Sequence, residues 1–150
     1  MRTPAFALAA VLVAFSFSAP LASAADVPEP GEIPDHVVQA MQDAERGDDT
    51  KDDERRQMAA TLAFTGVKPG DTVVDMVPGS GYWTRVFSRI VGASGQVYTV
   101  WPKEMLREYG VKGLAGWAEA SVAPHYDNVT DIVQPGAALA LPSPADVVFT

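Results

Sequence analysis

The order of apolar and polar positions predicts alternating helices and strands after residue 50. A first helical pattern runs to Phe64 and should end at Gly66. Its first turn is expected to hold Asp52, Asp53 and Glu54, because acidic residues favour a helix N-terminus. Its predicted buried positions are Met58, Ala59, Leu62 and Ala63. The apolar run at 72–77 then predicts a strand covered by helices on both faces, as in a parallel sheet.

A second amphipathic pattern follows this strand and predicts another helix. Its polar positions are Arg85, Ser88 and Arg89, and its expected buried stripe consists of Trp83, Val86, Phe87, Ile90 and Val91. Further strands are predicted at 96–100, 128–133 and 146–149, and Trp101-Pro102 should open a weak helix that contains Met105, Leu106 and Tyr109. Strands that alternate with helices indicate a parallel, right-handed α/β sheet.

Upstream of this pattern, a proline-rich lead-in should precede a short helix with Asp35 as its N-cap. The apolar side of that helix is expected to be Val37, Val38 and Met41, and it should end by Gly47. The next segment concentrates seven of the 19 acidic residues: Asp43, Glu45, Asp48, Asp49, Asp52, Asp53 and Glu54. A solvated connection is the expected structure of such a charge run, and its spacing does not favour the alternative of a metal or cationic-ligand patch.

Residues 1–24 have the pattern of a cleaved secretory signal peptide. Arg2 precedes an apolar stretch, and the small residues at 22–24 provide a cleavage site. The stretch is shorter than the ~20 residues that span a bilayer, so a permanent anchor is not expected. We therefore predict an exported protein, periplasmic or secreted, with a lead-in and helix at 25–50 and a main domain at 51–150.

Composition narrows the possible chemistry. The formal net charge is −8, and loss of Arg2 would leave 10 basic against 19 acidic residues, or −9. Such a charge opposes non-specific binding to nucleic acid or anionic membranes, but it does not identify a partner. The chain has no cysteine, which excludes disulfides and cysteine metal sites. Only His36 and His125 are histidines and no GxSxG motif occurs, so neither a metal site nor a catalytic triad is predicted.

The candidate chemistry lies in VVDMVPGSGYWT, residues 73–84, which predicts a strand, a glycine turn and a helix N-terminus in sequence. Gly79 and Gly81 permit positive φ and close approach of a ligand, and amide groups at the helix start favour an anion. A dinucleotide fingerprint would require a small residue where Thr84 stands. An S-adenosylmethionine loop of the form DxGxGxG would begin at Asp75, with Val77 in place of its first glycine.

The sequence resembles the secreted branch of predicted class I S-adenosylmethionine-dependent methyltransferases. The resemblance rests on LAFTGVKPGDTVVDMVPGSGYWTRVFSRIVG, on GQVYTVWP and on ALALPSPADVVFT, which occur in the family's order. It implies a Rossmann-like three-layer α/β sandwich of about four parallel strands with flanking helices. It also implies that residues 51–150 are the N-terminal portion of that domain, truncated after the fourth strand, so we expect the 150-residue chain to be inactive as a fragment.

The resemblance also implies a cofactor site for S-adenosylmethionine. Its amino-acid part would be surrounded by Asp75, Gly79, Ser80 and Gly81, with Tyr82 beginning the helix beneath. An acidic residue that binds the ribose usually stands where this chain has Trp101, whose ring could stack on adenine. Glu104 could replace the acid if the loop turns back. No catalytic residue and no methyl acceptor are implied.

Two further function classes remain open at this point. A non-enzymatic protein of the same fold, binding another small molecule or a partner protein, would explain the departures at Val77 and Trp101. A nicotinamide-dependent oxidoreductase would need a ribose-binding acid near Trp101 and a small residue at Thr84, and the sequence has neither.

Overall fold

The computed structural model describes residues 32–107 and 126–150. The predicted signal peptide, most of the lead-in, Tyr109 and His125 lie outside these ranges. None of the helices within them is long and apolar enough to cross a membrane.

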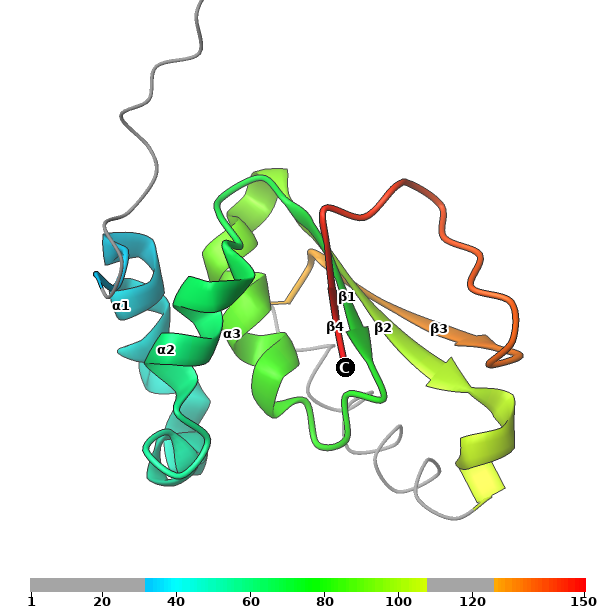
Figure 1. Ribbon diagram of the computed structural model, residues 1–150, viewed down its shortest axis with the longest axis horizontal. Coiled ribbons are helices and arrows are strands. Elements are labelled where there is room, and N and C mark those ends of the chain that lie inside the picture. Colours follow the sequence, from blue (N-terminus) through cyan, green and yellow to red (C-terminus); the bar gives the residue numbers. More distant parts are fainter. Residues whose placement is uncertain (1–31, 108–125) are drawn as a thin grey trace, which may run out of the picture.

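A four-stranded parallel sheet organises the described residues, with the strand order β3-β2-β1-β4 (Figure 1). The strands are β1 (Thr72–Met76), β2 (Gln96–Pro102), β3 (Val129–Gln134) and β4 (Val147–Phe149). In register, Val74 of β1 lies opposite Tyr98 of β2 and Val148 of β4. The predicted α/β fold with parallel strands is therefore confirmed.

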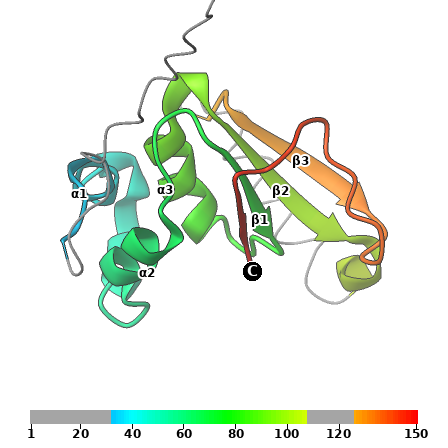
Figure 2. The same cartoon turned by 45° about the horizontal axis from the view of Figure 1, so that its top comes forward.

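The α-helices lie on one side of this sheet (Figure 2). Helix α3 (Tyr82–Val91) packs directly against β1 and β2, while α1 (Asp35–Met41) and α2 (Met58–Thr65) lie on its outer side (Figures 1 and 2). Three 3₁₀ segments, η2 (Ala44–Asp52), η3 (Gly92–Ser94) and η4 (Lys103–Arg107), complete the described elements. Gly66 ends α2 in the left-handed conformation, as predicted, with a φ of 65°.

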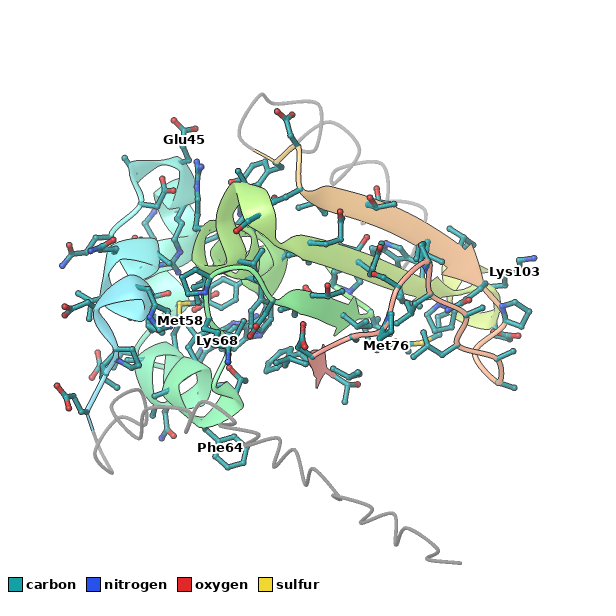
Figure 3. The ribbon with its side chains drawn as sticks, turned by 90° about the horizontal axis from the view of Figure 1, so that it is seen from above. Glu45, Met58, Phe64, Lys68, Met76 and Lys103 are labelled. Carbon is teal, nitrogen blue, oxygen red and sulfur yellow. The ribbon has the colours of Figure 1, made fainter. Side chains whose placement is uncertain are left out.

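The main core fills the space between the helices and one face of the sheet. Figure 3 shows Met58 pointing into this core, whereas Phe64, which is 91% exposed, projects from the other side of α2. The fully buried members of this core, each at most 2% exposed, are Val37, Met58, Leu62, Val67, Val73, Val86, Phe87, Ile90, Val91 and Val97. Burying each of these large apolar side chains contributes about 1.5–3 kcal/mol.

A smaller apolar cluster covers the opposite face of the sheet. It consists of Val74, Tyr98 and Val100, packed against Leu141 and Ala145 from the connection between β3 and β4. Among the described residues, that connection covers this second face of the sheet. Residues 108–125 lie outside the described ranges.

Several predicted helix boundaries and faces are wrong. Asp35 is the first helical residue and Pro34 the N-cap, and α1 buries Ala40 together with Val37, while Val38 is 36% exposed. Glycine-like geometry at Gln57, with a φ of 49°, delays the start of α2 to Met58. Asp52, which was predicted for the first turn of α2, is instead the last residue of η2, and Asp53 and Glu54 lie in the turns that follow. Asp52 pairs with Arg55, and Asp53 pairs with Arg46.

Two further expectations fail on the sheet side. Ser88 is 2% exposed, because its hydroxyl donates a 2.6 Å hydrogen bond to the Asn128 side chain. Trp101 and Pro102 do not open a helix, since they extend β2 by pairing with Val133 and Gln134 of β3. The helical turn after them is η4, a 3₁₀ segment.

The acidic segment between α1 and α2 is more than a solvated connection. Arg46, whose side chain is 1% exposed, forms two hydrogen bonds of 2.5 and 2.9 Å with the Asp53 carboxylate. Arg85 of α3 pairs with Asp49 at 2.5 Å, and Arg89 pairs with Asp43. The sequence pattern concealed these contacts because their arginines come from α3 as well as from the segment itself. The segment is thereby fastened to α3.

We expect the Arg46–Asp53 pair to carry much of this attachment. Asp53→Ala should lower the free energy of unfolding by about 3–5 kcal/mol, because it leaves the buried Arg46 guanidinium without its carboxylate. The matched control is Asp52→Ala, which breaks an exposed pair with Arg55 and should cost less than about 1 kcal/mol. Urea denaturation measures both values, and equal losses would contradict a buried structural ion pair.

Candidate small-molecule site at the glycine loop

The glycine loop joins β1 to α3 at the carboxyl end of the central strands. Its first residue, Val77, donates a backbone hydrogen bond of 2.9 Å to the Val100 carbonyl, which holds the loop against β2. The Gly81 N–H donates to the Pro78 carbonyl at 3.0 Å and closes the turn. Gly79 and Gly81 have φ values of 62° and 81°, which glycine adopts at no steric cost.

Val77 has the backbone geometry of a glycine. Its φ is 58°, in the left-handed region where a β-branched residue is strained by about 1–2 kcal/mol. Glycine would adopt this conformation at Val77 without that strain.

A cavity of about 340 Å³ opens beside this loop. Its volume lies in the range of about 300–1,000 Å³ that is usual for small-molecule sites. Figure 3 shows Met76, one of the lining residues, at the carboxyl end of β1. The lining consists of Arg56, Asp75, Met76, Val77, Pro78, Gly79, Ser80, Tyr82, Trp83, Phe149 and Thr150. A Cβ built on Gly79 would meet no atom within 4 Å, so a ligand can approach the loop backbone closely.

Asp75 supplies a buried carboxyl group at this cavity. It is 2% exposed, and the Thr84 hydroxyl donates a 2.6 Å hydrogen bond to its Oδ2 atom. Burial raises the pKa of Asp75 to about 6, although the bond from Thr84 acts in the opposite direction. A buried carboxyl with a displaced pKa in a cavity is a common feature of functional sites.

The acidic segment holds the end of the glycine loop that leads into α3. Arg85 donates a 2.9 Å hydrogen bond from Nη1 to the Ser80 carbonyl while it pairs with Asp49. The Tyr82 hydroxyl donates to Asp53 at 2.7 Å. Burial, followed by this bond, raises the pKa of Tyr82, so the hydroxyl stays a donor at neutral pH.

Four of the six predicted cofactor residues lie on the cavity wall: Asp75, Gly79, Ser80 and Tyr82. Gly81 instead caps the N-terminus of α3. Trp101 is 1% exposed and lies outside the lining, and its indole N–H has no acceptor in the part of the chain that the structure describes. Stacking of Trp101 on an adenine ring stays a prediction that this buried position does not favour.

Glu104 does not turn back toward the loop. Its Oε2 atom accepts a 3.0 Å hydrogen bond from the Gly136 N–H, after the end of β3. Bonds from its own backbone N–H and from Gly136 lower the pKa of Glu104. The side chain therefore holds the turn after β3 and does not replace a ribose-binding acid in this structure.

Sequence reasoning missed Arg56 and Trp83 as cavity residues. Trp83 follows Gly81 by two residues, and this closeness to the loop is a signal that could have placed it there. It was assigned to the core instead, and its ring does pack 4.9 Å from that of Phe149. No signal in the sequence points to Arg56, because its position depends on how the acidic segment folds over α3.

The described residues contain no group of three or more His, Cys, Asp or Glu side chains placed to hold a metal ion. His36 lies away from the cavity lining, where its Nε2 atom is 3.0 Å from the Val67 carbonyl. The chemistry that the cavity offers comes instead from open loop backbone, one carboxyl, one guanidinium and aromatic rings.

Comparisons with known proteins agree with this geometry. The sequence model of the family "Protein-L-isoaspartate(D-aspartate) O-methyltransferase" matches residues 53–126. The chain is 36% identical over 83 residues to the ubiquinone/menaquinone biosynthesis C-methyltransferase UbiE of Shewanella pealeana, covering 49% of this chain and 33% of the relative. The enzyme of the same name from Pasteurella multocida is also 36% identical, covering 49% of this chain and 31% of the relative. The chain spans about a third of the length of these curated relatives.

Among solved structures, a protein-L-isoaspartate O-methyltransferase superposes with a TM-score of 0.55 at 21% sequence identity. The superposition covers 78% of this chain and 43% of the solved chain. At this level of identity the likeness concerns the fold.

We expect the strain at Val77 to be measurable. Val77→Gly should raise the free energy of unfolding by about 0.5–1 kcal/mol, because glycine adopts the left-handed conformation without strain. Gly79→Ala is the matched opposite change. The new Cβ would meet no atom within 4 Å, so only backbone strain should lower the free energy of unfolding, by about 1 kcal/mol. Chemical denaturation that finds both variants equal to the wild type would contradict the assigned loop conformation.

Asp75 should make the protein less stable as the pH rises. In the unfolded chain the carboxyl loses its proton near pH 3.8, whereas in the folded protein it does so at about pH 6. The folded state therefore binds more protons between these values, and stability falls as the pH rises through this window. Between about pH 4 and pH 7 the wild type should lose about 2–2.5 kcal/mol that Asp75→Asn does not lose.

Urea denaturation across this pH range measures that loss. Thr84→Val provides the control, because removing the hydrogen bond that lowers the pKa should move the fall to higher pH. Parallel pH profiles for the wild type and Asp75→Asn would show that Asp75 does not titrate in this range.

Proposed function

Because the chain has the class I S-adenosylmethionine-dependent methyltransferase fold and matches a methyltransferase family, as predicted, we propose that it binds S-adenosylmethionine and takes part in methyl transfer. The observation that carries the proposal is the cavity at the carboxyl end of β1, lined by the glycine loop and Asp75. Ligands of open parallel α/β sheets bind at this edge, outside the carboxyl ends of the strands.

The residues present fit such a cofactor. Gly79 leaves its backbone open to the cavity, and the loop amides precede the N-terminus of the ten-residue helix α3, where an anionic group is favoured. The Asp75 carboxyl lies at the end of β1, where it can attract an ammonium group. When bound, the cofactor supplies a methyl group on a sulfonium, which is a good leaving group. The protein's part is to position the acceptor in line and to exclude water.

The methyl acceptor is a separate matter. The matched family is named for O-methylation of isoaspartate, whereas the curated relatives are named for C-methylation in quinone biosynthesis. These acceptors differ in both polarity and reacting atom. We therefore propose methyl transfer without assigning either acceptor to this chain.

We also propose that the protein is exported. The support is the N-terminal sequence, in which Arg2, an apolar stretch and the small residues at 22–24 follow the signal-peptide pattern. Mass spectrometry of the periplasmic fraction of the host should find a mature chain that begins at Ala25.

A second candidate is binding without methyl transfer, and the specific observation behind it is Trp101. A buried tryptophan stands at the position where an acid would bind the ribose hydroxyls. An indole has no lone-pair acceptor for those hydroxyls. A site that binds a ligand tightly and shows no turnover would support this second candidate.

Isothermal titration with S-adenosylmethionine tests the proposal. We expect the protein to bind S-adenosylmethionine at millimolar concentration or below. We expect no binding of NAD⁺, which has the same adenosine but carries a pyrophosphate in place of the amino-acid group. Gly79→Asn should weaken binding at least about tenfold, because its side chain enters the cavity while asparagine tolerates the left-handed backbone. Gly66→Asn is the matched control, with a similar φ of 65° outside the cavity, and should leave binding unchanged.

Absence of heat with the wild-type protein would remove the proposed function. Equal effects of the two asparagine variants would place the ligand elsewhere. Release of S-adenosylhomocysteine, measured first with an isoaspartyl peptide as acceptor, separates methyl transfer from binding alone.

A further inference from the structure

Most arginines in the segments around the cavity form ion pairs with aspartates. Five arginines lie between residues 46 and 89, and four of them form ion pairs with aspartates. The pairs are Arg46–Asp53, Arg55–Asp52, Arg85–Asp49 and Arg89–Asp43. The guanidinium of Arg56 has no ion-pair partner within residues 32–107 and 126–150, although it belongs to the most acidic part of the chain.

Arg56 is held at the cavity by its surroundings. Its backbone N–H donates a 2.9 Å hydrogen bond to the Asp52 carbonyl, which places it in a turn before α2. Its guanidinium lies 4.4 Å from the centre of the Tyr82 ring, within the range of a cation–π contact. The Tyr82 ring is itself fixed by the bond from its hydroxyl to Asp53.

Asp53, which contacts the same tyrosine as Arg56, is already engaged with other groups. Both carboxylate oxygens of Asp53 accept bonds from Arg46, and one of them also accepts the Tyr82 hydroxyl. Burial alone would raise the pKa of Asp53, but the bonds from Arg46 and Tyr82 lower it below its usual value. The Asp53 carboxylate is thus the partner of Arg46. The positive charge of Arg56 on the cavity wall can therefore interact with a ligand.

The cavity therefore carries one group of each sign, Asp75 and Arg56. A ligand that carries an ammonium and a carboxylate on one carbon atom offers a partner to each of these groups, and an α-amino acid group is such a ligand. A planar guanidinium can donate two parallel hydrogen bonds to a carboxylate, which gives it geometric specificity as well as charge.

We propose that Arg56 binds the α-carboxylate at the amino-acid end of the cofactor. This assignment rests on the proposed function and adds a residue that the glycine loop alone does not provide. Tyr82 acts as its platform, and the Arg46–Asp53 pair keeps that platform in place.

Two ligands separate this role from a general effect on the site. S-adenosylhomocysteine carries the amino-acid end, whereas 5′-methylthioadenosine keeps the adenosine and the thioether but lacks the carboxylate and the ammonium. Arg56→Gln should weaken binding of S-adenosylhomocysteine by about 10- to 100-fold, as expected for loss of a charged hydrogen-bonded pair. Binding of 5′-methylthioadenosine should change less than about twofold, because it does not reach Arg56.

Arg55→Gln is the matched control, since it removes a neighbouring exposed arginine that pairs with Asp52. It should leave both affinities unchanged, and circular dichroism of all variants verifies that they fold. Unchanged binding of S-adenosylhomocysteine by Arg56→Gln would overturn the proposal, as would equal losses for both ligands, which would indicate a structural role. If the wild-type protein binds neither ligand, the proposed function fails first, and this assignment falls with it.

Discussion

The buried ion pair between Arg46 and Asp53 is the interaction on which the site depends. An arginine whose side chain is 1% exposed is costly to bury, and only a well-placed carboxylate makes that position tolerable. The same carboxylate accepts the Tyr82 hydroxyl at the first turn of α3. One acidic residue, far from the glycine loop in sequence, thereby sets the position of the residue that begins the loop's helix. Arg85 repeats the arrangement by joining Asp49 to the Ser80 carbonyl. A segment that looks like a solvated charge run thus determines the wall of the cavity.

Two residues at the glycine loop are in states that lower the stability of the folded protein. Val77 adopts a positive φ that favours glycine, and Asp75 is buried so deeply that its pKa rises to about 6. Both are unfavourable choices for stability alone, and both lie on the cavity wall. Strain and displaced pKa values gather at functional sites because the surrounding structure holds them there. Here the surrounding structure is the core under α3, which buries Val86 and Phe87 completely.

The sheet and α3 were predictable because their apolar patterns are local and strong. The strands at 72–77 and 146–149 and the stripe from Val86 to Val91 follow directly from periodicity. The start of α2 at Met58 was not predictable, since it depends on a left-handed Gln57. Ser88 was wrongly predicted to be exposed, because polar residues usually face solvent. It is buried because it bonds to Asn128, which lies 40 positions away in sequence and cannot be recognised from the local pattern. For the site, the glycines and Asp75 could be identified from their order along the chain. Arg56 could not, because its role follows from which acids the other arginines occupy.

The two departures from the pattern of the resembled family would affect the proposed cofactor recognition differently. Val77 adopts a left-handed φ of 58° that glycine also adopts, so the side chain changes at a position whose backbone suits glycine. At the position where the resemblance implies an acid for the ribose, the indole of Trp101 offers no acceptor, and Glu104 is bonded to Gly136 instead. If the proposed cofactor makes fewer contacts at its ribose, more of its binding free energy must come from contacts at its amino-acid end. In the proposed binding mode, the other end of the ligand meets the Asp75 carboxyl and the Arg56 guanidinium, which has no ion-pair partner within residues 32–107 and 126–150. In a chain with a net charge of −8, an arginine that has no carboxylate partner among the described residues can offer its charge to a carboxylate of the ligand.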